Sequence, residues 1–226
     1  MTRVLQLALC LIGIGWGLLL HRIAQWLIKS PASEPGNGAS LLLTPATTRI
    51  FACIIASFCM VETVTTFQTQ YQWTFLVLIS ALIIAIITDA QTLLISRFTS
   101  IFLVPCAWLC AAVKLLPISL LSSIIGALFG YALLALTARV FHRLTQQQGL
   151  GQGDSDLLSC IGAFTGPWGV WLSLLFGSVL GTVVSIWLLS TGQATRTTPI
   201  PFGPFLALGA IVYLFYGSSF LTFIYG

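Results

Sequence analysis

The chain has 226 residues, of which 58% are hydrophobic and only 6% are charged. Because soluble domains carry about 25% charged residues, this chain cannot cover a soluble globule of its size with polar surface, and its hydrophobicity also excludes intrinsic disorder. The net charge of +4 comes from nine basic residues scattered along apolar segments, so we expect them to set membrane topology and expect no nucleic-acid partner. The composition therefore predicts an integral membrane protein.

The predicted fold class is all-α, a polytopic bundle of transmembrane helices. Residues 75–87 and 118–136 are apolar on every face, whereas strands of a membrane β-barrel alternate apolar and polar residues. A membrane-crossing helix needs about 20 mostly apolar residues, so the chain has room for about seven or eight crossings. In chain order we expect the membrane segments 4–20, 50–64, 73–87, 100–115, 118–138, 157–164, 170–189 and 202–223.

The first segment ends at His21 and Arg22 without the small residues of a signal-peptide cleavage site, so we expect a retained first helix. Residues 21–49 follow, and their Pro, Gly and Ser content predicts a short cytoplasmic connector. Because this loop carries no folded insertion, we expect residues 1–226 to form a single integral-membrane domain.

The basic residues predict the orientation of the bundle. If the N-terminus lies outside, all of them except Arg3 and Lys114 fall in cytoplasmic loops or helix ends, as the positive-inside rule requires. The basic residues on the inner side would be Arg22, Lys29, Arg49, Arg97, Arg139, Arg143 and Arg196.

Residues 157–189 are too long for one crossing and short for two. Gly166, Pro167 and Gly169 interrupt this stretch near its middle, and such residues break helices. The sequence therefore predicts either two short helices or one helix with a re-entrant segment, since irregular backbone is tolerated at membrane depth where it lines a cavity.

Cysteine and histidine do not indicate a metal or a cofactor. The six cysteines lie in apolar stretches and none forms a C-x-x-C pair, so we expect small buried hydrophobic side chains rather than disulfides or a zinc site. His21 and His142 each lie beside an arginine at the end of a predicted helix, where we expect an interfacial position. We therefore expect no metal and no cofactor.

The chain has five acidic residues, and two of them stand out. Asp89 directly follows an apolar run, where a carboxyl group either reaches out to water or has a function. Asp154 closes a glycine-rich turn, where it could cap a helix. Both are predicted at cytoplasmic helix ends, so the bundle can bring them to the same depth. Two carboxyl groups that share a proton can activate water on a peptide carbonyl.

Three motifs carry a resemblance to a known family. Residues 151–154, Gly-Gln-Gly-Asp, match the GxGD signature of membrane aspartic peptidases. The longer run 149–166 resembles the second motif of the type IV prepilin peptidases, and residues 89–99 resemble their first motif. Residues 200–209, which begin Ile-Pro-Phe-Gly-Pro, resemble the start of the last helix in that family. The resemblance extends over roughly residues 86–209.

The resemblance implies a membrane aspartic endopeptidase with Asp89 and Asp154 as its catalytic pair. Its substrates would be type IV prepilins or type II secretion pseudopilins, cut after a short basic leader near the cytoplasmic face of the bacterial inner membrane. Prepilin precursors and the lipid bilayer would then be its partners. The family motifs assign support of the loops and substrate to Gly151, Gly153, Pro201 and Gly203.

The chain departs from the family pattern at three places. Ser96 stands where the family usually has Pro, and Asp156 stands where it has Lys, so a third carboxyl group lies close to the pair. The loop 21–49 lacks the paired C-x-x-C insertion found in many members. We therefore expect cleavage without that metal-binding subdomain, and we do not carry over the methyltransferase activity of the family.

Two alternatives of a different class remain open at this level. The chain could be a catalytically degenerate membrane protein that binds pilin precursors, or a small proton-coupled transporter that uses Asp89. Transporters bury ionisable groups near the middle of the membrane. Because the acidic residues cluster at one predicted face, the sequence favours the peptidase.

Overall fold

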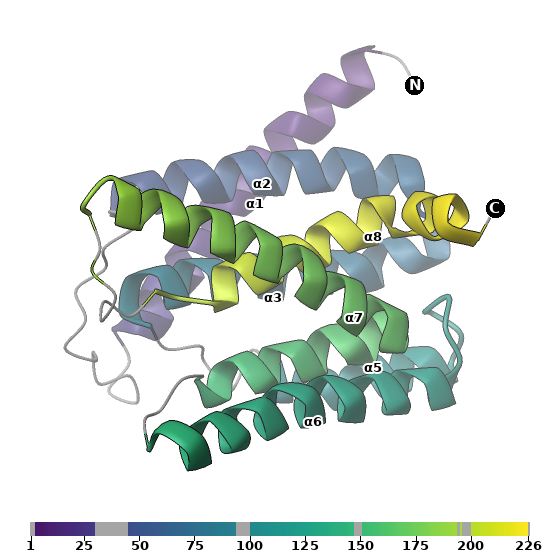
Figure 1. The fold of residues 1–226 in the computed structure, drawn as a ribbon. Coiled ribbons are helices and arrows are strands. Elements are labelled where there is room, and N and C mark those ends of the chain that lie inside the picture. Colours follow the sequence, from purple (N-terminus) through teal and green to yellow (C-terminus); the bar gives the residue numbers. More distant parts are fainter. Residues whose placement is uncertain are drawn as a thin grey trace.

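The computed structural model describes residues 3–29, 45–93, 100–146, 151–193, 195 and 200–225. The regular structure of these residues is entirely α-helical (Figure 1), which confirms the predicted fold class. The helices are α1 (Arg3–Ile28), α2 (Pro45–Thr66), α3 (Thr69–Thr92), α5 (Leu103–Ala112), α6 (Leu120–Thr145), α7 (Gln152–Ser190) and α8 (Gly203–Tyr225).

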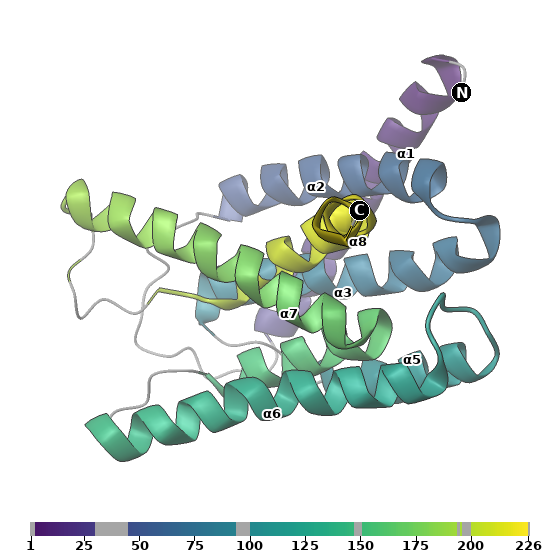
Figure 2. The ribbon, with the colours of Figure 1, turned by 45° about the vertical axis from the view of Figure 1, so that its right-hand side comes forward.

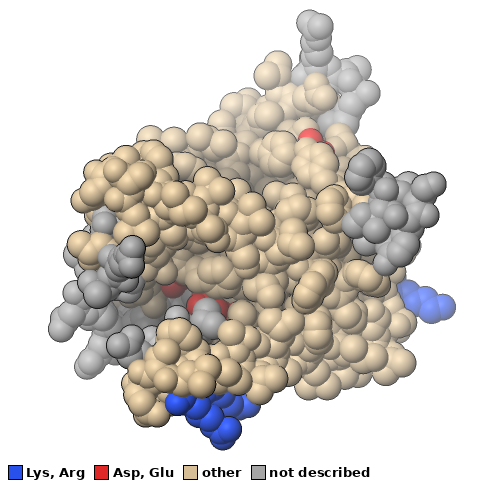
Figure 3. Space-filling model, viewed as in Figure 1, with Lys and Arg blue, Asp and Glu red and all other residues tan. Residues whose placement is uncertain are grey.

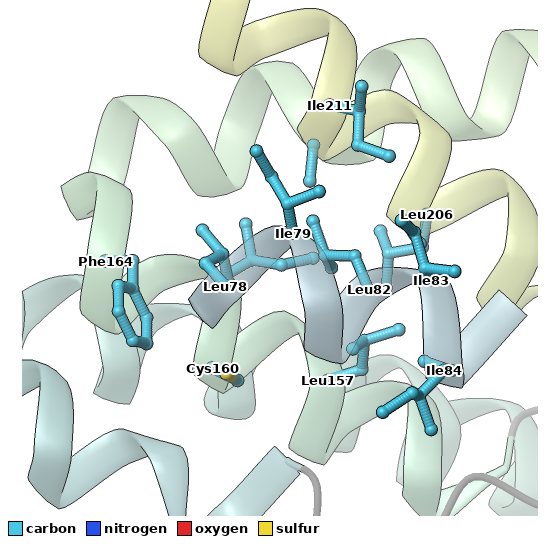
Figure 4. Close-up of a cluster of buried hydrophobic side chains, with 14 of the residues drawn as sticks. Leu78, Ile79, Leu82, Ile83, Ile84, Leu157, Cys160, Phe164, Leu206 and Ile211 are labelled. Atoms are coloured by element: carbon cyan, nitrogen blue, oxygen red, sulfur yellow. The ribbon is translucent and has the colours of Figure 1, made fainter. Parts of the chain in front are cut away.

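Helix α3 lies at the centre of the bundle. From Leu78 to Ala90 it is buried almost without interruption, as expected for a helix that is apolar on all sides. Figure 4 shows its side chains packed between those of α7, such as Phe164, and those of α8, such as Leu206 and Ile211. The end of α3 is thereby held between the same two helices.

The outer helices expose large apolar side chains. Leu11, Leu121 and Ile54 are 69%, 67% and 61% exposed, and most of the face in Figure 3 carries no charged atoms. Five of the helices are long and apolar enough to cross a membrane. Such an apolar surface is favourable in contact with lipid and unfavourable in contact with water. The chain is therefore a multi-pass membrane protein, as predicted.

Helix α7 is bent sharply near its middle. Gly166 has φ 75° and ψ −176°, a backbone conformation that glycine adopts and other residues avoid, and Pro167 follows without an N–H group. In Figures 1 and 2 the two halves, which we call the first and second arms of α7, diverge from this bend. Both ends of α7 therefore lie at the same end of the bundle. The predicted break is confirmed, and both arms are helical.

Helix α6 holds the first arm of α7 through backbone contact. A Cβ atom on Gly126 would collide with the carbonyl oxygen of Gly162, and one on Gly130 would lie 2.5 Å from the carbonyl oxygen of Leu158. The Ser123 hydroxyl also donates to a main-chain carbonyl of α7. Small residues permit this close approach between helices in membranes, and the contact fixes the N-terminus of α7.

The first helix is longer than predicted. It continues past the apolar run to Ile28, because no helix-breaking residue intervenes. His21 therefore lies inside α1 and is only 4% exposed, so the expectation that it lies at the end of the first helix is wrong. Helices α1 and α2 take up both ends of the predicted connector 21–49, and the residues between Lys29 and Pro45, Glu34 among them, lie outside the described part of the chain.

The contact between α6 and α7 predicts the effect of one added methyl group. We expect Gly126→Ala to lower the free energy of unfolding by about 1–3 kcal/mol, because its Cβ meets main-chain atoms that cannot move aside. Thermal unfolding of the detergent-solubilised protein, followed by circular dichroism, measures this. Gly15→Ala is the control, since nothing lies within 4 Å of its added Cβ. Equal stability of the two variants would contradict the tight contact.

Candidate active site

Three helix ends meet at one end of the bundle (Figures 1 and 2). Asp89 lies in the last turn of α3, Asp154 is the third residue of α7, and Gly203 is the first residue of α8. Figure 3 shows acidic atoms recessed in a hollow toward this end. Asp89 and Asp154 are only 5% and 7% exposed. The structure thus gathers residues that are up to 114 positions apart in sequence.

The main chain of α8 orients the Asp89 carboxyl group. The N–H of Gly203 donates to Oδ2 of Asp89, with 3.0 Å between nitrogen and oxygen. Helix N-termini offer such groups because their first N–H donors have no partner within the helix. In α8, Pro204 has no N–H and the N–H of Phe205 binds the carbonyl of Phe202 at 3.1 Å. In the first turn of α8, the Gly203 N–H is therefore the donor left for Asp89.

This hydrogen bond compensates for an unfavourable position. Asp89 lies in the last turn of α3, near the negative end of its helix dipole. Helix α3 ends at Leu93, whose backbone is left-handed with φ 55° and whose N–H binds the Asp89 carbonyl at 2.9 Å. The positive end of α8 faces the Asp89 carboxyl group and opposes the effect of α3.

Asp154 occupies the opposite kind of helix end. It lies in the first turn of α7, where the dipole favours a carboxylate, and its N–H binds the carbonyl of Gly151 at 3.2 Å. Gly151 has ordinary extended angles, with φ −71° and ψ 143°, so the backbone does not require glycine there. A Cβ on Gly151 would lie 3.5 Å from Oδ2 of Asp154. The glycine therefore leaves space beside that oxygen.

The two carboxyl groups lie near enough to each other to interact electrostatically. Asp156, two residues beyond Asp154, is 2% exposed, so the third acidic residue of this region is buried as well. Gly153 is half-buried and Pro201 is buried beside the start of α8. Residues 94–99, which include Ser96, and residues 147–150 lie outside the described part of the chain. In the described residues, no group of three or more His, Cys, Asp or Glu side chains is placed to hold a metal ion.

A polar contact that the sequence did not reveal joins the end of α3 to α1 and α2. The Gln25 side-chain amide donates to Oε1 of Gln91 at 2.8 Å, and the Gln91 amide donates to the hydroxyl of Thr48 at 2.7 Å. Gln91 lies two residues after Asp89, so the two side chains leave α3 on different sides. The only available signal was a pair of glutamines next to apolar runs, which is too common to identify a contact.

Comparison with known protein families matches residues 76–186 to the type IV leader peptidase family. Just under half of the chain is thus similar to that family. The leader peptidase segment contains both Asp89 and Asp154, together with α6 and most of α7. It does not include α1, α2 or the start of α8, although these helices supply Gln25, Thr48 and the Gly203 N–H.

Individual relatives carry the same family name. The prepilin leader peptidase/N-methyltransferase of Xanthomonas campestris pv. campestris is 41% identical over 98 residues, which are 43% of this chain and 34% of that protein. The protein of that name from Dichelobacter nodosus is 33% identical over 163 residues, 71% of this chain and 49% of that protein. The one from Bacillus subtilis is 32% identical over 148 residues, 65% of this chain and 57% of that protein.

The matched segments therefore span about a third to just over half of the length of these curated relatives. No solved structure gives a significant match.

The contact of Gln91 predicts that its amide stabilises the bundle. We expect Gln91→Met, which keeps the length of the side chain, to lower the free energy of unfolding by roughly 1–3 kcal/mol, because Gln25 and Thr48 lose a partner inside the protein. Thermal unfolding in detergent measures the change. Gln70→Met is the control, because Gln70 is exposed and its amide donates to the exposed side chain of Gln68. An unchanged midpoint for Gln91→Met would show that the contact contributes nothing.

Proposed function

We propose that the chain is a membrane aspartic endopeptidase that removes the short basic leader of type IV prepilins or type II secretion pseudopilins. The observation that carries this proposal is the pair of buried carboxyl groups, Asp89 and Asp154, which interact electrostatically at one end of an apolar bundle. The similarity of residues 76–186 to the type IV leader peptidase family supports it, as do the names of the relatives.

The proposed reaction needs one proton shared between the two carboxyl groups. The ionised carboxylate removes a proton from water, which attacks the carbonyl carbon of the peptide, while the protonated partner donates to the carbonyl oxygen. The tetrahedral intermediate then collapses, the C–N bond breaks, and the leaving amine takes up a proton from the pair. Water thus supplies the hydroxyl group of the new acid and a proton for the new amine, and no cofactor is needed.

The surrounding backbone has two proposed tasks. The Gly203 N–H keeps the Asp89 carboxyl group turned toward Asp154, and Pro201 restricts the chain just before that residue. Gly151 and Gly153 leave room for an extended peptide to approach the Asp154 carboxyl group. All four residues would thereby support the pair without taking part in proton transfer.

We place this site near the cytoplasmic face of the bacterial inner membrane, with residues 1–226 acting as one integral-membrane peptidase unit. The basic residues support the orientation, since Arg139 and Arg143 are near the end of α6 that leads toward Asp154. A transporter is disfavoured, because Asp89 and Asp154 lie at helix ends and not midway along them.

Removing either carboxylate tests the proposal. We expect Asp89→Asn and Asp154→Asn each to slow cleavage of a prepilin precursor by at least about 100-fold, because an amide cannot transfer the proton. Release of the leader by the purified protein in liposomes, followed by gel electrophoresis and mass spectrometry, is the measurement. Glu62→Gln is the matched control, since Glu62 lies near the opposite end of the bundle in α2. Cleavage that persists in either Asp variant would disprove the paired mechanism.

The same assay separates an enzyme from a degenerate relative. We expect the unaltered chain to cleave the precursor. If it does not, and Asp156→Lys does, the departure at this position has inactivated the chain and the proposal fails for the natural protein. The mass of the product also distinguishes a free N-terminus from a methylated one, so it tests the expectation that methylation is not carried over.

The hydrogen bond to Asp89 can be removed without removing a side chain. We expect Gly203→Pro to lower kcat by about 10- to 100-fold, since one charge-assisted hydrogen bond is worth roughly 1.5–3 kcal/mol. Proline is accepted at the first position of a helix, so α8 should still form. Gly203→Ala is the control because it keeps the N–H. Equal losses in both variants would assign the effect to the added side chain and reject this role of the N–H.

A further inference from the structure

An open groove of about 390 Å³ lies between the second arm of α7 and the segment that leads into α8. In Figures 1 and 2 this segment runs close to the second arm of α7, toward the end of the bundle where the helix ends meet. The groove is lined on the α7 side by Ser178, Thr182 and Ser185 and on the α8 side by Pro201, Phe202 and Phe205.

The α7 wall of the groove differs from the adjacent surface of the same helix. Next to it, Val183 and Trp187 are 60% and 56% exposed, as expected for side chains that face lipid. Within the groove, the Thr182 hydroxyl donates to the Ser178 carbonyl at 2.7 Å, and the Ser185 hydroxyl donates to the Gly181 carbonyl at 2.6 Å. Apart from Ile186, this wall consists of small residues whose hydroxyl groups are used within the helix. It is therefore suited to close contact with an apolar helix.

Along the chain, the α8 wall leads directly to the candidate active site. Phe202 lines the groove, and the next residue is Gly203, whose N–H binds Asp89. Phe205, on the same wall, packs against Gly181 of the opposite wall, where an added Cβ would lie 3.3 Å from its ring. The α8 wall therefore includes residues on both sides of the main-chain donor to Asp89.

We propose that this groove binds an apolar segment of a membrane-anchored substrate, on the side of the cleaved bond opposite the basic leader. The inference rests on the proposed function and adds the site at which the substrate docks. Because the outer surface of the bundle is apolar, a membrane-anchored substrate reaches the carboxyl pair sideways through the bilayer. The donor to Asp89 lies between the wall residues Phe202 and Phe205 in sequence. This favours the substrate as occupant, since a lipid or a second copy of the chain has no need to reach Asp89.

Charge supports the same direction of binding. Asp89, Asp154 and Asp156 lie at the end of the bundle where α8 begins, and all three are buried. An acidic end attracts the basic leader of the substrate while the apolar segment stays in the groove. The bond to be cut, which joins these two parts, is then held at the carboxyl pair.

The test compares two substrates and two substitutions on adjacent residues. One substrate is a full-length precursor in liposomes, and the other is a soluble peptide that contains the leader and the cleaved bond but lacks the apolar segment. We expect Thr182→Leu to fill the groove and lower kcat/KM for the full-length precursor by about 10-fold or more, while cleavage of the peptide is unchanged. Val183→Leu, on the lipid-facing side, should leave both activities unchanged. Equal losses on both substrates, or equal effects of the two substitutions, would overturn the proposal.

A second measurement separates this inference from the proposed function. A photoreactive residue in the apolar segment of the precursor should crosslink to the groove residues, and Thr182→Leu should reduce this product, whether or not cleavage occurs. Crosslinks elsewhere on the bundle, or to lipid alone, would exclude the groove as the docking site. Crosslinking between two copies of the chain through the groove would exclude the substrate as its occupant. An unaltered protein that crosslinks in the groove but cleaves neither substrate would refute the peptidase activity and leave substrate docking in place.

Discussion

The burial of acidic side chains at one end of an apolar helix bundle is the constraint on which the rest of the structure depends. A carboxylate removed from water is costly unless donors and dipoles replace its hydration. In a helical membrane protein the unpaired main-chain donors occur at helix N-termini. Asp154 lies at such a terminus in its own helix, and Asp89 is reached by the terminus of α8 through Gly203. The position of the pair at helix ends therefore follows from the available donors.

The surrounding helices hold those ends in place. Helix α6 fixes the first arm of α7 through glycine contacts at Gly126 and Gly130, and the bend at Gly166 turns the second arm back toward the same end of the bundle. On the other side of α3, the amide of Gln91 joins α1 and α2 to the turn that carries Asp89. Helix packing in lipid lacks the hydrophobic driving force of water, so close backbone contact and polar bridges take its place.

The leader peptidase segment, residues 76–186, is not sufficient to build the site. It contains the carboxyl pair and the small groove residues Thr182 and Ser185. The donor to Asp89 and the other wall of the groove come from the start of α8. Three separate parts of the chain thus contribute to one end of the bundle, and the family motif describes the acidic groups more fully than it describes their surroundings.

The sequence by itself determined the membrane class, the helical architecture, the break near Gly166 and the two motif positions Asp89 and Asp154, because these follow from composition, from apolar run length and from short-range motifs. It underestimated the length of α1, because an apolar run shows only where a helix crosses lipid, and the helix can continue beyond that run. Only the tertiary structure decided that Gly203 donates to Asp89, that Gln91 joins three helices, and that a groove lies between α7 and the segment that leads into α8. Those features depend on how distant helix ends meet in space, and no local pattern of residues encodes that meeting.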